Sequence, residues 1–258
     1  MPKILGKILI LGGTTEARLL AERLAGRSDL DVTLSLAGRT ASPARQSVPV
    51  RSGGFGGATG LADYLVNERI DILIDATHPY ASVISANAVE AARKTDVRFV
   101  ALRRPRWVAV AGDRWSEVSN VREAVRTLGQ APRRVFVALG RNELAPFKDA
   151  PQHHYLIRSV DPVDPPLPLP YVSYVTGRGP FSEADDRALM TAHGIEVVIA
   201  KNSGGSATYG KIAAARAVGI GVIMVQRPPA PAAPAVATVE DALAWLDHAL
   251  TSATARDV

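Results

Sequence analysis

The first residues of the chain that could do chemistry form a glycine–threonine turn, Gly12-Gly13-Thr14-Thr15-Glu16. It follows a short apolar run, 8–11, and leads into a segment with apolar residues at helical spacing. Backbone N–H groups at such a helix start attract phosphate, and glycine lets a ligand approach the backbone because it has no Cβ. The turn therefore suggests nucleotide binding. Its spacing departs from G-x-G-x-x-G/A, so the turn alone does not decide the matter.

A second chemical signal is the run Gly38-Arg39-Thr40, which follows the second predicted strand. In dinucleotide folds an acidic residue at this place binds the ribose 2′-OH, whereas an arginine accommodates a 2′-phosphate. The chain has no Asp or Glu between Val32 and Thr40. Arg39, together with Ser35 or Thr40, thus favours NADP(H) over NAD(H). The alternative is a solvated loop arginine.

The run Asp75-Ala76-Thr77-His78-Pro79-Tyr80-Ala81 follows another predicted strand. His78 and Tyr80 are candidates to position a nicotinamide or to donate a proton, since histidine exchanges protons near neutral pH. In the alternative interpretation, Asp75 or Thr77 caps the next helix and Tyr80 packs on the sheet. For Asp75 we favour the structural role.

Basic residues also follow strands, where they could bind an acidic ligand. Arginine binds carboxylates in a bidentate manner, and the alternative is a basic surface turn. The second-half loop that begins at Lys201 precedes a helix, but it is not a Walker A loop because Lys211 is followed by Ile212. The candidate anion-binding residues in these loops are Arg104, Arg106, Arg178, Lys201, Asn202, Ser203 and Gly204.

Strand-like and helical segments alternate along most of the chain, which predicts parallel sheets covered on both faces. The expected strands are 8–11, 31–36, 48–51, 70–75, 98–102, 135–139, 155–160, 171–176, 196–200 and 221–225. The expected helices include 61–67, 82–93, 183–193, 209–217 and 239–250. We predict two Rossmann-like α/β domains with a cleft between them. Residues 1–130 would bind a dinucleotide and residues 131–258 the substrate.

Composition narrows the function classes further. The 258 residues include no cysteine and five scattered histidines, so we expect no disulfide, no thiolate chemistry and no metal site. No apolar run is long enough for a membrane span and no signal peptide is evident, which favours a cytoplasmic protein. The net charge of +5 suggests an anionic partner. Dispersed basic residues and few aromatics favour a small polyanion over nucleic acid.

Several of these runs, taken in order, resemble the precorrin-6A reductase family of cobalamin biosynthesis. The runs that carry the resemblance are 10–17, 75–81, 104–107, 176–181, 201–205, 211–216 and 226–228. The resemblance implies NADPH-dependent hydride transfer to a macrocycle that carries many carboxylates, converting precorrin-6A to precorrin-6B. Related enzymes act on a cobalt-containing substrate, and that alternative, with NADH, stays open here.

Together, the residues and the resemblance assign roles. The candidates for the proton donor are His78, Tyr80 and Lys201, with water as the alternative. The candidate cofactor contacts are Gly12, Gly13, Thr14, Thr15, Glu16, Ser35, Gly38, Arg39, Thr40 and Thr77.

Two rival functions remain. A short-chain type of reductase would need a Tyr-x-x-x-Lys pair, yet Tyr80 is followed four residues on by Ile84, and Tyr209 by Ala213. A non-catalytic NADPH-sensing module would not need the arginine-rich loops.

Overall fold

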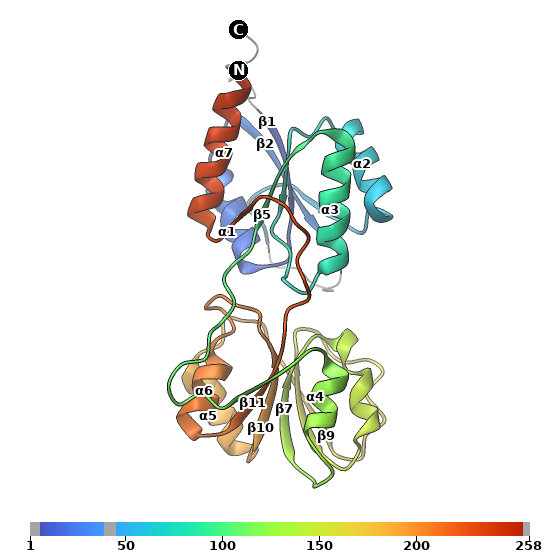
Figure 1. Ribbon diagram of the computed structural model, residues 1–258, viewed down its shortest axis with the longest axis vertical. Helices are drawn as coiled ribbons and strands as arrows, with labels where there is room; N and C mark the ends of the chain where they lie inside the picture. Colours follow the sequence, from blue (N-terminus) through green and yellow to red (C-terminus); the bar gives the residue numbers. More distant parts are fainter. Residues whose placement is uncertain (1–5, 39–44, 255–258) are drawn as a thin grey trace. The chain divides into compact units, whose positions relative to one another are not determined.

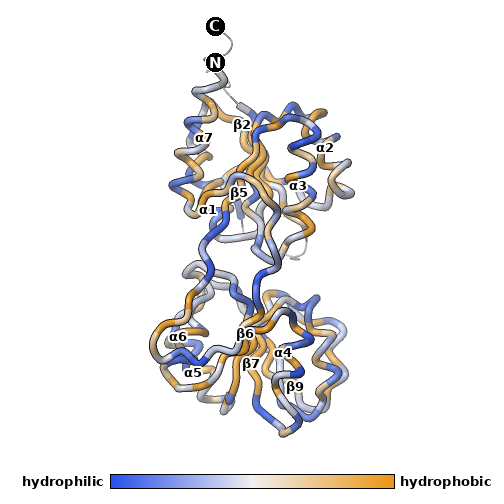
Figure 2. The backbone as a smooth tube through the Cα atoms, in the orientation of Figure 1, coloured by the Kyte–Doolittle hydropathy of each residue, from blue (hydrophilic) through white to orange (hydrophobic). Residues whose placement is uncertain are grey.

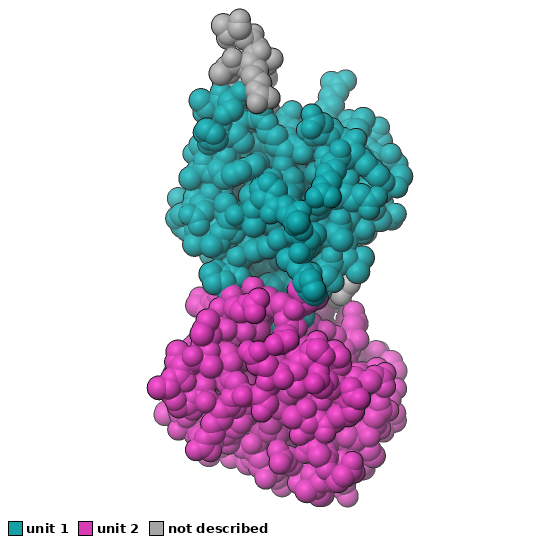
Figure 3. Space-filling view, viewed as in Figure 1, with its two compact units in different colours: residues 1–105, 229–258 teal, residues 106–228 magenta. Residues whose placement is uncertain are grey.

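The chain folds into two compact units in a computed structural model that describes residues 6–38 and 45–254. Unit 1 comprises Met1–Pro105 and Pro229–Val258, and unit 2 comprises Arg106–Pro228 (Figure 3). Each unit contains one six-stranded sheet in which the paired strands are parallel. The predicted fold class, two Rossmann-like parallel-sheet domains, is confirmed.

The sheet of unit 1 has the strand order β12-β5-β4-β1-β2-β3. Its strands are β1 (Gly6–Leu11), β2 (Leu30–Leu36), β3 (Val50–Ser52), β4 (Ile72–Asp75), β5 (Arg98–Leu102) and β12 (Ala235–Val236). The strand order reverses at β1, which pairs with β2 on one side and with β4 on the other. Ligands of open α/β sheets bind beyond the carboxyl ends of the strands at such a reversal. The loops after β1 and β4 are therefore where a ligand is expected.

Helices cover both faces of this sheet (Figure 1). The helices α1 (Thr15–Leu24) and α7 (Val239–Thr254) lie on one face, and α2 (Gly57–Asn67) and α3 (Ser82–Thr95) on the other. Figure 2 shows the apolar strands between them. The apolar residues of α1 recur at positions 17, 20, 21 and 24, and all four are buried. The helical spacing in the sequence thus places one stripe of α1 against the sheet.

Unit 2 repeats the arrangement with the strand order β6-β11-β10-β7-β8-β9. Its strands are β6 (Trp115–Val118), β7 (Arg134–Ala138), β8 (His154–Ser159), β9 (Val172–Thr176), β10 (Val197–Lys201) and β11 (Gly221–Val225). Helices α5 (Glu183–Ala192) and α6 (Gly210–Val218) lie on one face and α4 (Val121–Thr127) on the other. The short 3₁₀ helices η1 (Arg141–Glu143) and η2 (Ala145–Asp149) follow β7. The strand order reverses between β7 and β10.

The units divide at Arg106 and Pro229, not at the predicted boundary after residue 130. The reason is that each sheet takes one edge strand from beyond that boundary. β6, which the sequence analysis missed, pairs with β11 in unit 2. The C-terminal segment returns to unit 1, where β12 pairs with β5 and α7 buries Leu246 in the core that also holds Leu20 of α1. The chain therefore passes between the units twice.

His153, which directly precedes β8, predicts a pH-dependent stability of unit 2. Its side chain is fully buried beside the Tyr155 ring, and burial lowers the pKa of His153 below its ordinary value of 6.5. The unfolded chain thus takes up the proton first, so the contribution of His153 to stability is present above pH 6.5 and is lost as the pH falls. We expect the free energy of unfolding to fall with a slope of up to about 1.4 kcal/mol per pH unit below that value.

Urea unfolding at a series of pH values measures this slope. His153→Gln should flatten it, whereas His193→Gln, which removes an exposed histidine of the same unit, should leave it unchanged. Equal slopes in the wild type and His153→Gln would contradict the assignment.

Candidate functional site

The turn after β1 presents backbone at the carboxyl end of the sheet of unit 1. Gly12 donates its N–H to the Ser35 carbonyl at 2.9 Å, and a Cβ at this position would lie 2.6 Å from Leu34 Cδ1. Gly13 has φ +111°, and a Cβ there would meet no atom within 4 Å. A side chain at position 12 would therefore displace the end of Leu34, whereas Gly13 is favoured by its backbone conformation and faces open space.

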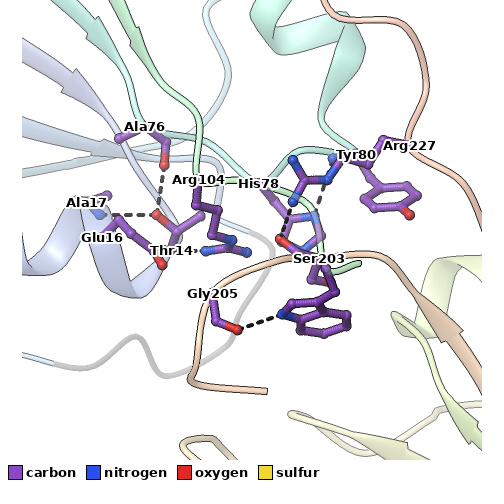
Figure 4. A network of polar contacts seen from close by, with 11 residues as sticks. Thr14, Glu16, Ala17, Ala76, His78, Tyr80, Arg104, Ser203, Gly205 and Arg227 are labelled. Carbon is purple, nitrogen blue, oxygen red and sulfur yellow. Dashed lines mark hydrogen bonds and ion pairs between the residues drawn. The ribbon is translucent and has the colours of Figure 1, made fainter. Parts of the chain in front are cut away.

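Thr14 shapes this turn with its side chain. Its hydroxyl caps α1 by accepting from the Ala17 N–H at 3.1 Å, and it donates to the Ala76 carbonyl at 2.8 Å. A threonine hydroxyl has one proton, so Thr14 has no second proton to donate to a ligand. Figure 4 shows that Thr14 joins the loops after β1 and β4. It thus acts as a positioning residue for the turn, in front of the first N–H groups of α1.

Glu16 and Arg104, predicted to contact different ligands, form an ion pair with each other inside unit 1 (Figure 4). Glu16 lies in the first turn of α1, and Arg104 follows β5. Their side chains are 21% and 14% exposed. A carboxylate at the start of α1 would repel a bound phosphate, and the guanidinium offsets that charge. Arg104 therefore serves first as the partner of Glu16.

The loop after β4 is organised by Asp75. This buried carboxylate accepts from the Thr77 N–H at 3.1 Å and from the Thr77 hydroxyl at 2.6 Å. Asp75 therefore has a structural role in this loop, but it is not the predicted helix cap, because the N-cap of α3 is Ala81 and no side chain caps it. The two bonds to Asp75 fix Thr77 at the carboxyl end of the sheet.

His78 and Tyr80 come next in this loop and contact each other. The Tyr80 N–H donates to His78 Nδ1 at 3.3 Å, and the two rings lie 5.5 Å apart at 36°. Because Nδ1 accepts a hydrogen bond, the neutral ring carries its proton on Nε2. Both side chains are partly exposed. His78 can therefore donate a proton from Nε2 while the backbone of the same loop holds its ring.

A pocket of about 190 Å³ lies in unit 1 beside these loops. Three of the predicted cofactor residues, Gly12, Ser35 and Thr77, contribute to its wall. Most of the glycine-rich run 52–57, to which no function was assigned from the sequence, also lines the pocket. The remaining lining residues are Leu11, Ala37, Gly53, Gly54, Phe55, Gly56, Gly57, Leu61, Ile84 and Asn87.

The predicted 2′-phosphate residues, Arg39 and Thr40, lie outside the described residues. Gly38 immediately precedes them and has φ +70°. A Cβ on Gly38 would lie 3.8 Å from the Gly53 N, so the ends of β2 and β3 are close together here.

In unit 2 the loop after β10 is built around Trp107. The Asn202 side chain accepts from the Trp107 N–H at 2.7 Å and donates to the Trp107 carbonyl at 2.9 Å. The indole Nε1 donates to the Gly205 carbonyl at 2.8 Å. Asn202 is buried, and its amide is committed to the backbone on which it folds. Asn202 thus has a structural role in this loop, and its contact with a substrate stays a prediction.

Arg227 also binds this loop, and it lies next to the point where the chain returns from unit 2 to unit 1. Its Nε donates to the Asn202 carbonyl at 2.7 Å and its Nη2 to the Ser203 carbonyl at 3.0 Å. Gly204 follows with φ +68° and is buried. The segments through Trp107 and Arg227 are therefore both tied to the loop 201–205.

The Asn202→Ala variant should reveal this structural role. It leaves the N–H and carbonyl of Trp107, a residue only 9% exposed, without their partners. We expect the free energy of unfolding to fall by about 2–4 kcal/mol, since each unsatisfied buried group costs about 1–3 kcal/mol. Urea unfolding measures the loss, and Asn142→Ala, an exposed asparagine of the same unit, is the control. Equal stability of the two variants would contradict the role.

The other predicted substrate contacts differ in their surroundings. Lys201 forms an ion pair with Glu143 of η1, which joins the loops after β7 and β10 at the strand reversal of unit 2. Arg106 and Arg178 are exposed. Arg178 lies on the loop after β9, where Phe181 packs on Arg158 with 3.7 Å between the ring centroid and Cζ. Arg158 in turn forms a buried ion pair with Asp186, a pair that the sequence analysis missed.

Two further searches cover the described part of the chain. No group of three His, Cys, Asp or Glu side chains there could hold a metal ion. No helix among residues 6–38 and 45–254 is both long and apolar enough to cross a membrane.

The sequence matches a known family, "Precorrin-6x reductase CbiJ/CobK", over residues 7–247. A precorrin-6A reductase from Sinorhizobium sp is 56% identical over 247 residues, which cover 96% of this chain and 95% of the relative. A cobalt-precorrin-6A reductase from Priestia megaterium is 27% identical, with 96% of this chain and 99% of the relative covered. Among solved structures, CobK precorrin-6A reductase has a TM-score of 0.91 at 48% identity, with 95% of this chain and 97% of that chain covered.

Proposed function

The chain belongs to the precorrin-6x reductase family, CbiJ/CobK, and on this premise we propose that it reduces precorrin-6A to precorrin-6B with NADPH in cobalamin biosynthesis. The observation that carries the proposal is the pocket in unit 1 at the carboxyl ends of β1, β2 and β4, next to an open glycine turn at the start of α1. That is where a doubly wound sheet receives a dinucleotide. The reduced nicotinamide would supply a hydride to the macrocycle.

The residues of unit 1 fit a dinucleotide. Gly13 leaves open space above the turn, and α1 begins directly after it. The first N–H groups of a helix have no partner within the helix, so those of Thr15 and Glu16 are suited to a pyrophosphate. The apolar part of the pocket, with Phe55 and Ile84, suits an adenine ring. Arg39, with Ser35, Gly38 and Thr40, remains the sequence-based prediction for the 2′-phosphate.

The substrate would be held through its carboxylates. The exposed Arg106 and Arg178 of unit 2 are suited to bind them, with Ser203 and Gly204 nearby on the loop after β10 as further candidates. Arg104 and Lys201 carry carboxylate partners of their own, so they set the local charge in addition to any contact with the substrate. His78 would donate a proton from Nε2, and Thr77 would help to place the nicotinamide. Binding both reactants side by side supplies much of the rate enhancement.

Two alternatives to this function are a reductase that acts on a cobalt-containing substrate and a module that binds NADPH without catalysis. The higher identity to a precorrin-6A reductase, 56% against 27% for a cobalt-precorrin-6A reductase, favours the metal-free substrate. The partly exposed His78, whose ring is held by its own loop, favours an enzyme over an NADPH-sensing module.

A spectrophotometric assay tests the proposal. Purified protein is mixed with NADPH and precorrin-6A, and the loss of nicotinamide absorbance is followed beside matched reactions with NADH and with cobalt-precorrin-6A. We expect the fastest loss with NADPH and precorrin-6A. Tight NADPH binding without consumption would favour an NADPH-sensing module. Faster turnover of cobalt-precorrin-6A would favour the alternative in which the substrate contains cobalt.

A further inference from the structure

Arg51, to which the sequence analysis gave no role, has its guanidinium fixed at the end of β2. It lies on β3 opposite Ser35 of β2 in the parallel register. One amino group, Nη1, donates to the Ser35 hydroxyl at 3.2 Å and to the Gly53 carbonyl at 2.8 Å. The other, Nη2, donates to the Gly54 carbonyl at 2.8 Å. The guanidinium carbon also lies 3.7 Å from the centre of the Phe55 ring.

These contacts place the Arg51 guanidinium against the wall of the pocket in unit 1. Four of its partners, Ser35, Gly53, Gly54 and Phe55, line that pocket. The end of β2 is also the place where a doubly wound fold distinguishes a ribose 2′-OH from a 2′-phosphate. In a bound dinucleotide, the positive charge of Arg51 would therefore lie close to the 2′-phosphate that separates NADPH from NADH.

The charge of Arg51 is not balanced by a carboxylate. Its partners among the described residues are a hydroxyl, two carbonyls and aromatic rings, and none of the ion pairs between described residues includes it. The partly buried cations Arg104 and Lys201 differ, because each pairs with a glutamate. A partly buried cation with neutral partners favours an incoming anion. A 2′-phosphate would supply that anion.

The guanidinium is also held in place before any ligand arrives. Three hydrogen bonds and the stack on Phe55 fix its plane, while Nε–H and the second Nη2 proton have no acceptor among the described residues. A preformed donor group loses little entropy on binding. The planar fork of arginine suits a phosphate better than the point charge of lysine does.

We infer that Arg51 is a specificity-determining residue that selects a 2′-phosphorylated adenosine in the pocket of unit 1. This inference rests on the proposed function, because it assigns the recognition of the phosphate that distinguishes NADPH. It adds a guanidinium on β3 to Arg39, which the sequence places after β2.

Calorimetric titration of the full chain with 2′,5′-ADP and with 5′-ADP tests the inference without any turnover. The wild type should bind 2′,5′-ADP more tightly. Arg51→Gln should weaken 2′,5′-ADP by about 10- to 100-fold, the range expected for hydrogen bonds to a charged group. The affinity for 5′-ADP should change by less than about 3-fold, as for a group that does not touch the shared atoms. Arg51→Lys, which keeps the charge but not the fork, should fall between wild type and Arg51→Gln.

Arg23→Gln is the matched control, since it removes a positive charge from the exposed surface of α1 in the same unit. It should leave both affinities unchanged. If Arg51→Gln and Arg51→Lys each lose as much affinity for 5′-ADP as for 2′,5′-ADP, Arg51 only supports the structure of the run 53–55. That result would overturn the inference. An undiminished preference for 2′,5′-ADP in both variants would overturn it as well. If the wild type binds neither nucleotide, the proposed function itself fails.

Discussion

The His78→Ala variant is expected to lose about 10²- to 10⁴-fold in kcat, the usual contribution of a positioned general acid. The reason is that the Tyr80 N–H occupies Nδ1 and leaves the ring proton on Nε2, in a partly exposed loop beside the carboxyl end of the sheet. The dissociation constant of NADPH should stay close to the wild-type value, because the residues proposed to contact the adenosine and the pyrophosphate lie elsewhere. Steady-state kinetics with precorrin-6A and a separate NADPH titration measure the two effects.

Two further variants separate the candidate donors. Tyr80→Phe removes only the phenol hydroxyl and keeps the ring that contacts His78. Lys201→Met removes the amine that pairs with Glu143. We expect both variants to retain most of kcat. A large loss in Tyr80→Phe with normal turnover in His78→Ala would transfer the role to Tyr80, and unchanged kcat in all three would leave water as the donor.

Gly13→Ala is expected to weaken NADP⁺ binding by about 10- to 100-fold, because a side chain at φ +111° costs about 1–3 kcal/mol or forces the turn to move. The pyrophosphate would then lose its alignment with the start of α1. The free energy of unfolding should fall by a similar amount at most. Titration of NADP⁺ by calorimetry, with urea unfolding alongside, measures both quantities.

Gly26→Ala provides a close control for this substitution. A Cβ at Gly26, as at Gly13, meets no atom within 4 Å, but Gly26 is not in the left-handed region. The two variants therefore differ mainly in backbone conformation and in position, since Gly13 precedes α1 and Gly26 follows it. If Gly13→Ala binds NADP⁺ as tightly as Gly26→Ala does, the turn after β1 is not the pyrophosphate site.

Local patterns predicted most elements of the fold. The apolar run and glycine turn located β1 and α1, and the predicted bounds of β5 and β11 agree with the structure. The segment with β6 and α4 was missed because these elements are short and polar, and β6 exposes Ser116 and Glu117. The two-residue strand β12 follows a proline-rich loop and has no periodicity of its own. The assignment of β12 to unit 1 depends on its pairing with β5, and this pairing between distant segments cannot be seen in the sequence.

Local patterns in the sequence also predicted part of the candidate site. Three residues that the sequence places at or just after strand ends, Gly12, Ser35 and Thr77, line one pocket. Residue types could not show that Glu16 pairs with Arg104, 88 positions away, or that Asn202 folds onto Trp107. Arg51 was overlooked because its significance lies in what surrounds it. A strand arginine with neutral partners in the fold looks like any solvated arginine in the sequence.

The most direct test of the account is a crystal structure of the protein soaked with NADP⁺. We predict density for the pyrophosphate over Gly13 and the first N–H groups of α1, with the adenosine in the pocket beside Phe55. Density for the dinucleotide on the loop 201–205 of unit 2, with the turn after β1 empty, would contradict the account.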